Sequence, residues 1–378
     1  MLLTKKLFDY LDSVISGKRK GLFTVVLKLS LFDLSLLYSG VVRLRRWLYY
    51  NDILRAKRLP CKVISIGNIV AGGSGKTPAA IAIASMIRDY TEYYELSSLK
   101  MAIVTRGYRG MAHANSVVSD GSNILMNASD AGDEPYMMAH KLPGIPVIIG
   151  KDRYRSGLTA IQKWGSQVII LDDGFQYLRL IKDINIITID STRPFGFNYM
   201  LPMGYLREPL STIKKADIIL LTRVDQCKNL GVIKEKIELI APRVPVFESV
   251  HTPYALYAPG TSQNSGLDTI KNRNILALCG ISNPESFVCT LKSLNPARVD
   301  LISFPDHYRY NTKSIEFIEA KALEFRSDMI ITTEKDVLKL SAMKLPVFVL
   351  AIRLQLIGST DRDFMSLILQ KIMKGKPT

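Results

Sequence analysis

The stretch SIGNIVAGGSGKTPAA, residues 65–80, constrains the fold more than any other part of the chain. A short apolar run leads into a glycine-rich turn, and residues with helical character follow the turn. Gly75-Lys76-Thr77 matches the end of the phosphate-loop pattern, whereas Val70 stands where that pattern has its first Gly. A strand, a glycine turn and a helix in this order predict a phosphate-binding loop at a helix N-terminus.

Each residue type in this loop has an expected role. Glycines let the backbone N–H groups of residues 72–77 approach phosphate oxygens without a Cβ in the way. We expect Lys76 to reach the β- and γ-phosphates and the Thr77 hydroxyl to bind Mg²⁺. The alternative to a phosphate loop is a glycine-rich turn that only starts a helix. The predicted nucleotide-binding residues are Val70, Ala71, Gly72, Gly73, Ser74, Gly75, Lys76 and Thr77.

Apolar runs recur along the chain and predict an α/β fold. KMAIVTRGY, PVIIG, QVIILDDG, INIITID and DIILLTRVD each end in polar residues or Gly, and helix-like segments separate several of them. This pattern indicates a doubly wound, mostly parallel sheet, in which ligands bind beyond the C-terminal strand ends. We therefore predict a phosphate-loop domain over residues 59–240, which the family resemblance described below implies to be a kinase domain.

The remaining segments differ from this pattern in their composition. Residues 1–58 are predicted to be a basic, apolar, membrane-associated segment. Residues 241–272 mix short extended runs with Pro, Gly and Ser, and predict a linker with room for a strand pair. Residues 273–378 contain further apolar runs and predict a second, smaller α/β domain.

Composition narrows the class of protein. The 378 residues are 47% hydrophobic and 22% charged, which is typical of an ordered globular chain. Four cysteines without a C-x-x-C pair argue against a disulfide scaffold or a structural zinc site, and favour a reducing compartment. The formal net charge of +16 predicts anionic partners such as nucleic acid, acidic lipid or a phosphorylated substrate.

The apolar segment at residues 21–50 has basic residues at both ends. Lys28 and Asp33 interrupt it, which argues against a signal peptide and makes a membrane span costly. On a helical wheel, five polar or basic residues share one stripe: Thr24, Lys28, Ser35, Ser39 and Arg46. We expect a helix in the membrane interface whose basic residues meet anionic headgroups, with a core helix docked on the next domain as the alternative.

Six further motifs follow the loop in order: TRGYRG (105–110), GDEP (132–135), DDGFQ (172–176), LPMGYLREPL (201–210), FPDHYRY (304–310) and TEKD (333–336). Together with the loop they span residues 62–336, and the chain resembles the tetraacyldisaccharide 4'-kinases, the lipid A 4'-kinases of Gram-negative bacteria. Phe175 and Tyr205 stand where that family commonly has Leu and Pro, which affects local packing more than chemistry.

The resemblance implies a phosphotransferase of lipid A biosynthesis that uses ATP and Mg²⁺. It would phosphorylate the 4'-hydroxyl of a tetraacyldisaccharide 1-phosphate at the cytoplasmic face of the bacterial inner membrane, as a peripheral or monotopic protein. The implied partners are this acylated lipid and the anionic membrane surface. We expect neither nucleic acid nor an obligate protein partner.

The resemblance also implies the catalytic residues. Asp133 would accept or orient the proton of the attacking hydroxyl, and His307 would form a dyad with it across the two domains. Lys76 and Arg207 would act on phosphate groups. From the residues alone, the alternatives are a helix cap for Asp133, a structural residue for His307 and a surface ion pair for Arg207.

The strand-end motif VIILDDGFQ supplies the predicted metal ligands. One of Asp172 and Asp173 is expected to hold Mg²⁺ together with Thr77, although a turn at the strand end would also use an Asp. Arg106, Tyr108 and Arg109 are further candidates for phosphate contacts.

Two other classes compete with the kinase. One is a membrane-associated phosphate-loop ATPase or GTPase without a lipid acceptor; the segment 222–225, Thr-Arg-Val-Asp, loosely resembles a guanine-reading motif. The other is a nucleic-acid-binding module, which rests on the net charge and lacks an aromatic-basic or zinc-finger signature.

Overall fold

A computed structural model describes residues 10–15, 17–94, 99–107, 110, 115–259, 264–340, 343–358 and 361–373. Tyr108 and Arg109, two candidates for phosphate contacts, lie outside this part of the chain.

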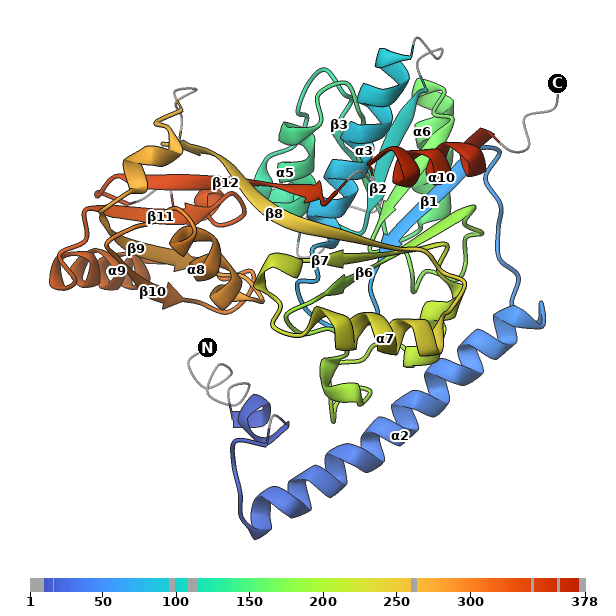
Figure 1. The fold of residues 1–378 in the computed structure, drawn as a ribbon. Helices are drawn as coiled ribbons and strands as arrows, with labels where there is room; N and C mark the ends of the chain where they lie inside the picture. Colours follow the sequence, from blue (N-terminus) through green and yellow to red (C-terminus); the bar gives the residue numbers. More distant parts are fainter. Residues whose placement is uncertain are drawn as a thin grey trace.

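The described residues form one twelve-stranded sheet, which crosses the whole molecule (Figure 1). From edge to edge its strands are β10 (Arg298–Ser303), β9 (Asn274–Cys279), β11 (Met329–Thr333), β12 (Val347–Leu356), β8 (Val246–Tyr257), β7 (Ile218–Thr222), β6 (Ile184–Asp190), β1 (Lys62–Gly67), β5 (Val168–Asp172), β2 (Met101–Thr105), β4 (Val147–Ile149) and β3 (Ser116–Ser119). All neighbours are parallel except the pairs β12–β8 and β4–β3.

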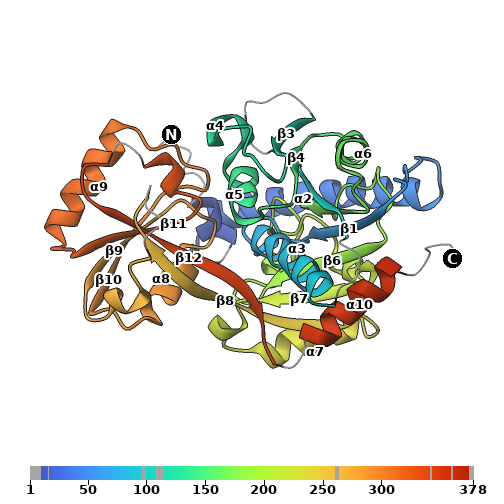
Figure 2. The ribbon, with the colours of Figure 1, turned by 90° about the horizontal axis from the view of Figure 1, so that it is seen from above.

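Helices cover both faces of the sheet, as a doubly wound fold requires (Figure 2). The helices of the described chain include α2 (Leu22–Tyr50), α3 (Lys76–Tyr93), α4 (Ala128–Ala131), α5 (Asp133–Lys141), α6 (Arg153–Trp164), α7 (Leu230–Ile240), α8 (Pro284–Lys292), α9 (Thr312–Glu324) and α10 (Asp361–Met373), of which α2 lies apart from the sheet. The predicted α/β fold is thereby confirmed.

Local sequence explains several helix boundaries. The Asp152 side chain accepts hydrogen bonds from two backbone N–H groups and caps α6, which ends at Gly165 in the left-handed conformation. Asn283 caps α8, whose first residue is a proline, and Asn311 forms a capping box at the start of α9. The chain therefore specifies where these helices begin before any packing is considered.

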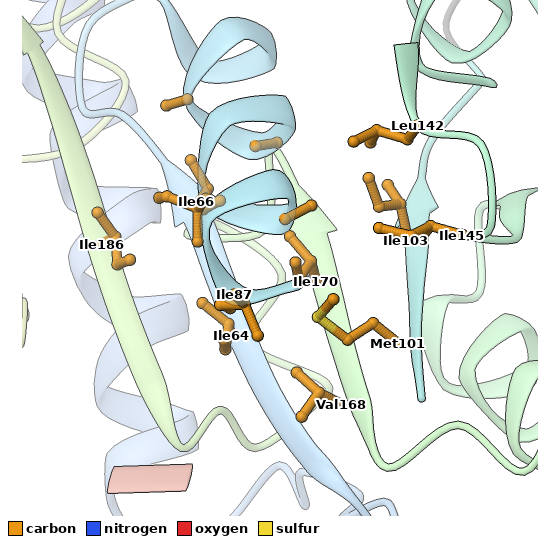
Figure 3. Packing of buried hydrophobic residues seen from close by; sticks show 14 of the residues in the cluster. Ile64, Ile66, Ile87, Met101, Ile103, Leu142, Ile145, Val168, Ile170 and Ile186 are labelled. Atoms are coloured by element: carbon orange, nitrogen blue, oxygen red, sulfur yellow. The ribbon is translucent and has the colours of Figure 1, made fainter. Parts of the chain in front are cut away.

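The main core lies between the central strands and α3 (Figure 3). Ile64 and Ile66 of β1 and Ile170 of β5 pack there against Ile87 of α3, all with 1% exposure or less. Strands β2, β5 and β7 are buried along their whole length, which explains their unbroken apolar sequences. This packing fixes the start of α3, and with it the glycine-rich loop, at the C-terminal end of β1.

The region 241–272, predicted to be a linker, contributes a twelve-residue strand instead. β8 pairs with β7 through its first residues and with β12 along the rest of its length, so it joins the two α/β units in one sheet. Its buried residues alternate, as in a strand with one covered face. Pro253 misled the interpretation, but it faces Ile352 at a register shift, where a strand tolerates proline.

The end of the chain also departs from the predicted domains, because α10 returns to the first unit rather than completing the second. Phe364 is fully buried and packs edge-on against Phe247, with 5.0 Å between ring centroids. Met365 and Ile368 join the same core as α3. Residues 273–378 therefore do not form a separate unit throughout.

Helix α2 presents its polar stripe to the protein and not to the surroundings. Thr24, Leu31 and Ser35 are buried, and the Ser35 hydroxyl donates to the Met200 carbonyl over 2.9 Å. Arg46 forms a 2.9 Å ion pair with Glu208. Ser35 and Arg46 of this stripe do not meet lipid headgroups as expected, because they find partners on the loop at residues 199–208.

The opposite face of α2 is apolar and exposed. Leu22, Phe23, Leu29, Leu37 and Val41 each keep 60% or more of their surface exposed. Among the described residues, α2 is the one helix long and apolar enough to cross a membrane by length and composition, and 11% of its most apolar window is buried. The described residues leave this apolar surface uncovered, and an apolar surface of this size is typical of a protein or membrane interaction site.

Candidate active site

The glycine-rich loop joins β1 to α3 and places its backbone at the sheet's C-terminal edge. Gly75 adopts a left-handed conformation (φ 79°) immediately before the first residue of α3. A Cβ there would lie 3.2 Å from His251 Nε2 and 3.3 Å from Thr222 Cγ2, so both conformation and space require glycine. The loop ends at a helix N-terminus that points its free N–H groups outward, an arrangement that favours phosphate.

A cleft of about 1190 Å³ opens above this loop between the two α/β units. Ala71 to Thr77 line it, as do Arg106, Asp172, Asp173, Arg207 and His307. The second unit supplies one wall through the segments 281–283, 306–307 and 333–335. Val70 instead packs in the apolar cluster behind the loop, and Asp133 reaches the cleft through His307.

The two strand-end carboxylates at the end of β5 have different surroundings. Arg207 donates from both terminal nitrogens to Asp173, over 2.9 and 3.3 Å, and Lys76 Nζ lies 3.8 Å from the same carboxylate. Thr77 donates to Asp172 over 3.4 Å, as does Thr105. Asp173 is therefore the partner of the cations, while Asp172 lies beside hydroxyl groups.

The pKa values of the two carboxyls move in opposite directions. Burial raises the pKa of Asp172, and the neighbouring charges of Glu134 and Asp173 raise it further. Burial acts on Asp173 as well, but Lys76 and Arg207 outweigh it and hold the pKa of Asp173 below its usual value. A cation bound beside Asp172 would favour its ionised form.

This corner of the cleft fits Mg²⁺. Asp172 Oδ1 is buried and has no hydrogen-bond partner among the described residues, which marks it as an available oxygen ligand. Thr77 and Asp173 lie within the same corner. Mg²⁺ commonly takes one or two protein oxygens and completes its shell with phosphates and water, so this small set suffices. The described residues contain no cluster of three or more His, Cys, Asp or Glu around one metal position.

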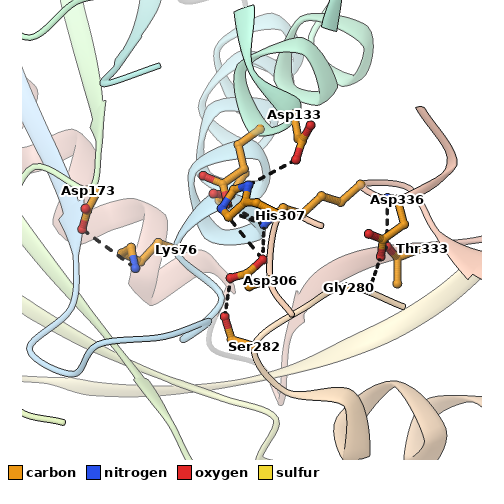
Figure 4. A network of polar contacts seen from close by, with 12 residues as sticks. Lys76, Asp133, Asp173, Gly280, Ser282, Asp306, His307, Thr333 and Asp336 are labelled. Carbon is orange, nitrogen blue, oxygen red and sulfur yellow. Dashed lines mark hydrogen bonds and ion pairs between the residues drawn. The ribbon is translucent and has the colours of Figure 1, made fainter. Parts of the chain in front are cut away.

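Asp133 and His307 come together although 174 residues separate them. His307 Nδ1 lies 3.2 Å from Asp133 Oδ2, and both side chains are nearly buried (Figure 4). Asp133 is the first residue of α5; Gly132 occupies the cap position, and Asp133 makes no cap hydrogen bond there. The helix-cap interpretation of Asp133 is therefore wrong.

Two lysines from the segment after β11 complete this cluster. Lys339 Nζ lies 2.5 Å from Asp133 Oδ2, and Lys335 Nζ lies 3.2 Å from His307 Nε2. Burial raises the pKa of Asp133, but hydrogen bonds from His307 and Lys339 outweigh it and keep that pKa below its usual value. Asp133 is thus held as a carboxylate that can accept a hydrogen bond.

Two residues of the cleft have uncommon backbone conformations. Asp173 has φ 52° and His307 has φ 60°, values that side chains other than glycine rarely adopt. Such strain costs about 1–3 kcal/mol per residue and persists where surrounding contacts fix the chain. The side chain of Asp173 points toward Lys76 and Arg207, and the side chain of His307 points toward Asp133.

Sequence reasoning missed several groups of the cleft. Arg223, considered above as part of a guanine-reading motif, donates to the Gly73 carbonyl over 3.0 Å and to Asp190 over 2.7 Å, so it supports the glycine-rich loop. Lys335 and Lys339 were not assigned a role. Lys335 lies two residues after the end of the mostly buried strand β11, and a strand-end position is the same signal that led to Asp172 and Asp173.

A glycine-rich loop at the head of α3, opening into a cleft that a second unit closes, defines the class: this is a phosphate-loop nucleotide-binding protein. The comparisons identify the group within that class. The chain belongs to the tetraacyldisaccharide-1-P 4'-kinase family, whose family model matches residues 27–373. The resemblance inferred from the six motifs is confirmed.

Individual relatives agree with this assignment. A tetraacyldisaccharide 4'-kinase of Syntrophus aciditrophicus is 38% identical over 95% of this chain and 96% of its own length. That of Desulfatibacillum aliphaticivorans is 37% identical over 85% of each chain. A crystal structure of LpxK from Aquifex aeolicus in complex with ATP has a TM-score of 0.70 at 31% identity, covering 92% of this chain and 99% of that one.

Proposed function

We propose that this protein transfers the γ-phosphate of ATP to the 4'-hydroxyl of a tetraacyldisaccharide 1-phosphate. The observation that supports this most is the shared cleft. One wall carries a phosphate loop, and the facing wall brings His307 within 3.2 Å of Asp133. An ATPase without a lipid acceptor needs the phosphate loop, whereas a kinase also needs a group that receives the proton of the attacking hydroxyl.

In the proposed reaction each group of the cleft has a part. The acceptor oxygen attacks the γ-phosphorus, its bond to phosphorus forms as the bond to the bridging oxygen of ADP breaks, and its proton passes to the Asp133 carboxylate. Lys76 stabilises the charge on the β- and γ-phosphates, and Arg207, now paired with Asp173, is placed to contact phosphate as well. Thr77 and Asp172, with Asp173, would hold Mg²⁺, which neutralises phosphate charge when bound.

The exposed face of α2 indicates how the protein meets its substrate. An acylated disaccharide stays in a bilayer, so the enzyme has to work at the membrane surface. Leu37, Val41 and Leu44 would lie among acyl chains, while the exposed Arg43 and the basic residues at 18–20 would meet anionic headgroups. We propose a monotopic protein at the cytoplasmic face of the inner membrane, with no nucleic acid and no obligate protein partner.

The test is phosphate transfer to lipid. The full-length protein in detergent is incubated with γ-labelled ATP, Mg²⁺ and the dispersed precursor, and the lipid is separated and counted. We expect label in the lipid fraction, and a loss on the order of 10²–10⁴-fold with Lys76→Ala, which removes one strong electrostatic contact. A precursor already phosphorylated at the 4' position is the matched negative substrate. Release of labelled inorganic phosphate without labelled lipid would support the ATPase instead.

A further inference from the structure

Lys335 is buried at the centre of a polar network that the proposed reaction leaves without a role. Its side chain is 13% exposed. Nζ lies 2.8 Å from Asp306 Oδ1, 3.2 Å from Glu134 Oε1 and 3.2 Å from His307 Nε2. Asp306 and His307 belong to the second unit and Glu134 belongs to α5 of the first. Lys335 therefore contacts Nε2 of the histidine ring, whereas Asp133 contacts Nδ1.

The charge of Lys335 restricts the histidine. Burial alone would lower the pKa of Lys335, but Glu134 and Asp306 outweigh burial and raise it, so the side chain is an ammonium. An ammonium group has three donors and no acceptor. The contact at 3.2 Å is then a hydrogen bond only if His307 Nε2 offers its lone pair. The single ring proton must sit on Nδ1, where it donates to Asp133 Oδ2.

We propose that Lys335 is a positioning residue that holds His307 as the neutral tautomer with its proton on Nδ1. The inference rests on the proposed function, in which Asp133 receives the proton of the acceptor hydroxyl. Nδ1 already carries a proton in this arrangement, so His307 orients the carboxylate and does not take a proton from it. His307 and Lys339 both contact Oδ2, which leaves Oδ1 as the oxygen for the acceptor.

The arrangement also depends on both units. Lys335 and His307 come from the second unit, whereas Asp133 and Glu134 begin α5 in the first. The tautomer is therefore set when the segment after β11 lies against α5. Lys141 offers a matched comparison: it forms a 2.6 Å ion pair with Glu334 across the same junction and does not share the contacts of Lys335 with the dyad.

Nitrogen-15 NMR of the histidine rings tests the proposal. The chain has four histidines, and a His307→Gln spectrum identifies the His307 signals in the full-length, nucleotide-free protein. We expect an Nδ1–H, Nε2-acceptor pattern in the wild type. Lys335→Met should convert it to a mixture with the Nε2–H form and lower kcat on the order of 10–100-fold, as the removal of a group that orients a metal-binding histidine does. The KM for ATP should stay near its wild-type value.

Matched variants separate positioning from general support. Lys335→Arg should retain part of the Nδ1–H signal, and Lys141→Met should leave it unchanged while weakening the junction between the units. Should Lys335→Met fail to fold, Lys335→Gln provides the same measurement. Unchanged His307 shifts in a folded Lys335 variant would overturn the proposal, as would a loss confined to ATP affinity. A protein that shows the tautomer but phosphorylates no lipid would overturn the proposed function alone.

Discussion

At the residue scale, the central prediction concerns the contact between the Asp133 and His307 side chains. Their 3.2 Å contact joins a carboxylate and an imidazole. We propose that the two act as one unit, so that the loss of either partner removes the arrangement that both create. Groups that act as a unit are strongly non-additive when they are mutated. The mutational behaviour of the pair therefore distinguishes a catalytic role from separate structural roles.

We predict that Asp133→Ala and His307→Ala each reduce turnover sharply, and that the double variant is little worse than the poorer single variant. ATP affinity should change modestly in all three, because neither residue belongs to the glycine-rich loop. Turnover and melting temperature measured on the same proteins provide the check. Multiplicative losses of turnover in the double variant would show that the two residues act independently. Lower melting temperatures with turnover per folded molecule preserved would show that both roles are structural.

At the scale of elements, α2 connects the outside of the molecule to the cleft. Its polar stripe packs on the loop at residues 199–208, where the Tyr38 hydroxyl donates to the Arg207 carbonyl over 3.2 Å. The side chain of the same Arg207 binds Asp173 in the cleft. Docking of α2 thus contributes to the position of a residue that faces the nucleotide site.

We predict that Leu37→Ser, Val41→Ser and Leu44→Ser, combined, release the protein from membranes. Their side chains are 69%, 66% and 56% exposed, so the folded protein loses little packing, whereas burial of each in lipid is worth about 1.5–3 kcal/mol. Sedimentation with anionic vesicles checks the shift to the soluble fraction. Arg46→Glu is the contrasting variant: it breaks the pair with Glu208 and should lower stability, with membrane binding retained. Undiminished sedimentation of the triple variant would refute the assignment of this face.

At the scale of the whole molecule, β8 and β12 tie the two units together before α10 returns to the first. Leu354 and Leu356 at the end of β12, and then Phe364 and Ile368 of α10, all join the core that contains α3. The last strand and helix in the sequence thus stabilise the element that begins at the glycine-rich loop. A substitution in α10 should therefore lower the stability of α3, which begins at the glycine-rich loop.

We predict that Phe364→Ala lowers the free energy of unfolding by about 3–5 kcal/mol, the cost of a large cavity in a closed core. The loss should appear as faster hydrogen exchange in α3 and β1, although Phe364 lies in the region first predicted to be a separate domain. Denaturant unfolding followed by residue-resolved exchange measures both. Leu323→Ala on α9, where the side chain is 72% exposed, is the control and should change little. Faster exchange confined to α8 and α9 would contradict this account.

The sequence by itself determined the features that depend on neighbouring residues. Alternating apolar runs predicted the parallel sheet, Gly75-Lys76-Thr77 predicted the phosphate loop at the head of a helix, and the order of the motifs indicated the family. Each of these signals lies within a short stretch of chain, where residue type constrains the backbone directly. The sheet, the phosphate loop and the family can therefore be predicted from the sequence alone.

Only the tertiary structure decided which side chains from distant parts of the sequence contact each other. The stripe of α2 is polar whether it faces water, lipid or protein. Its direction became clear from Ser35 and Arg46, which, like Tyr38, contact the loop at residues 199–208. Likewise, nothing local in TEKD indicates that Lys335 touches His307. Contacts between residues far apart in the chain depend on the folded path, and periodicity does not encode that path.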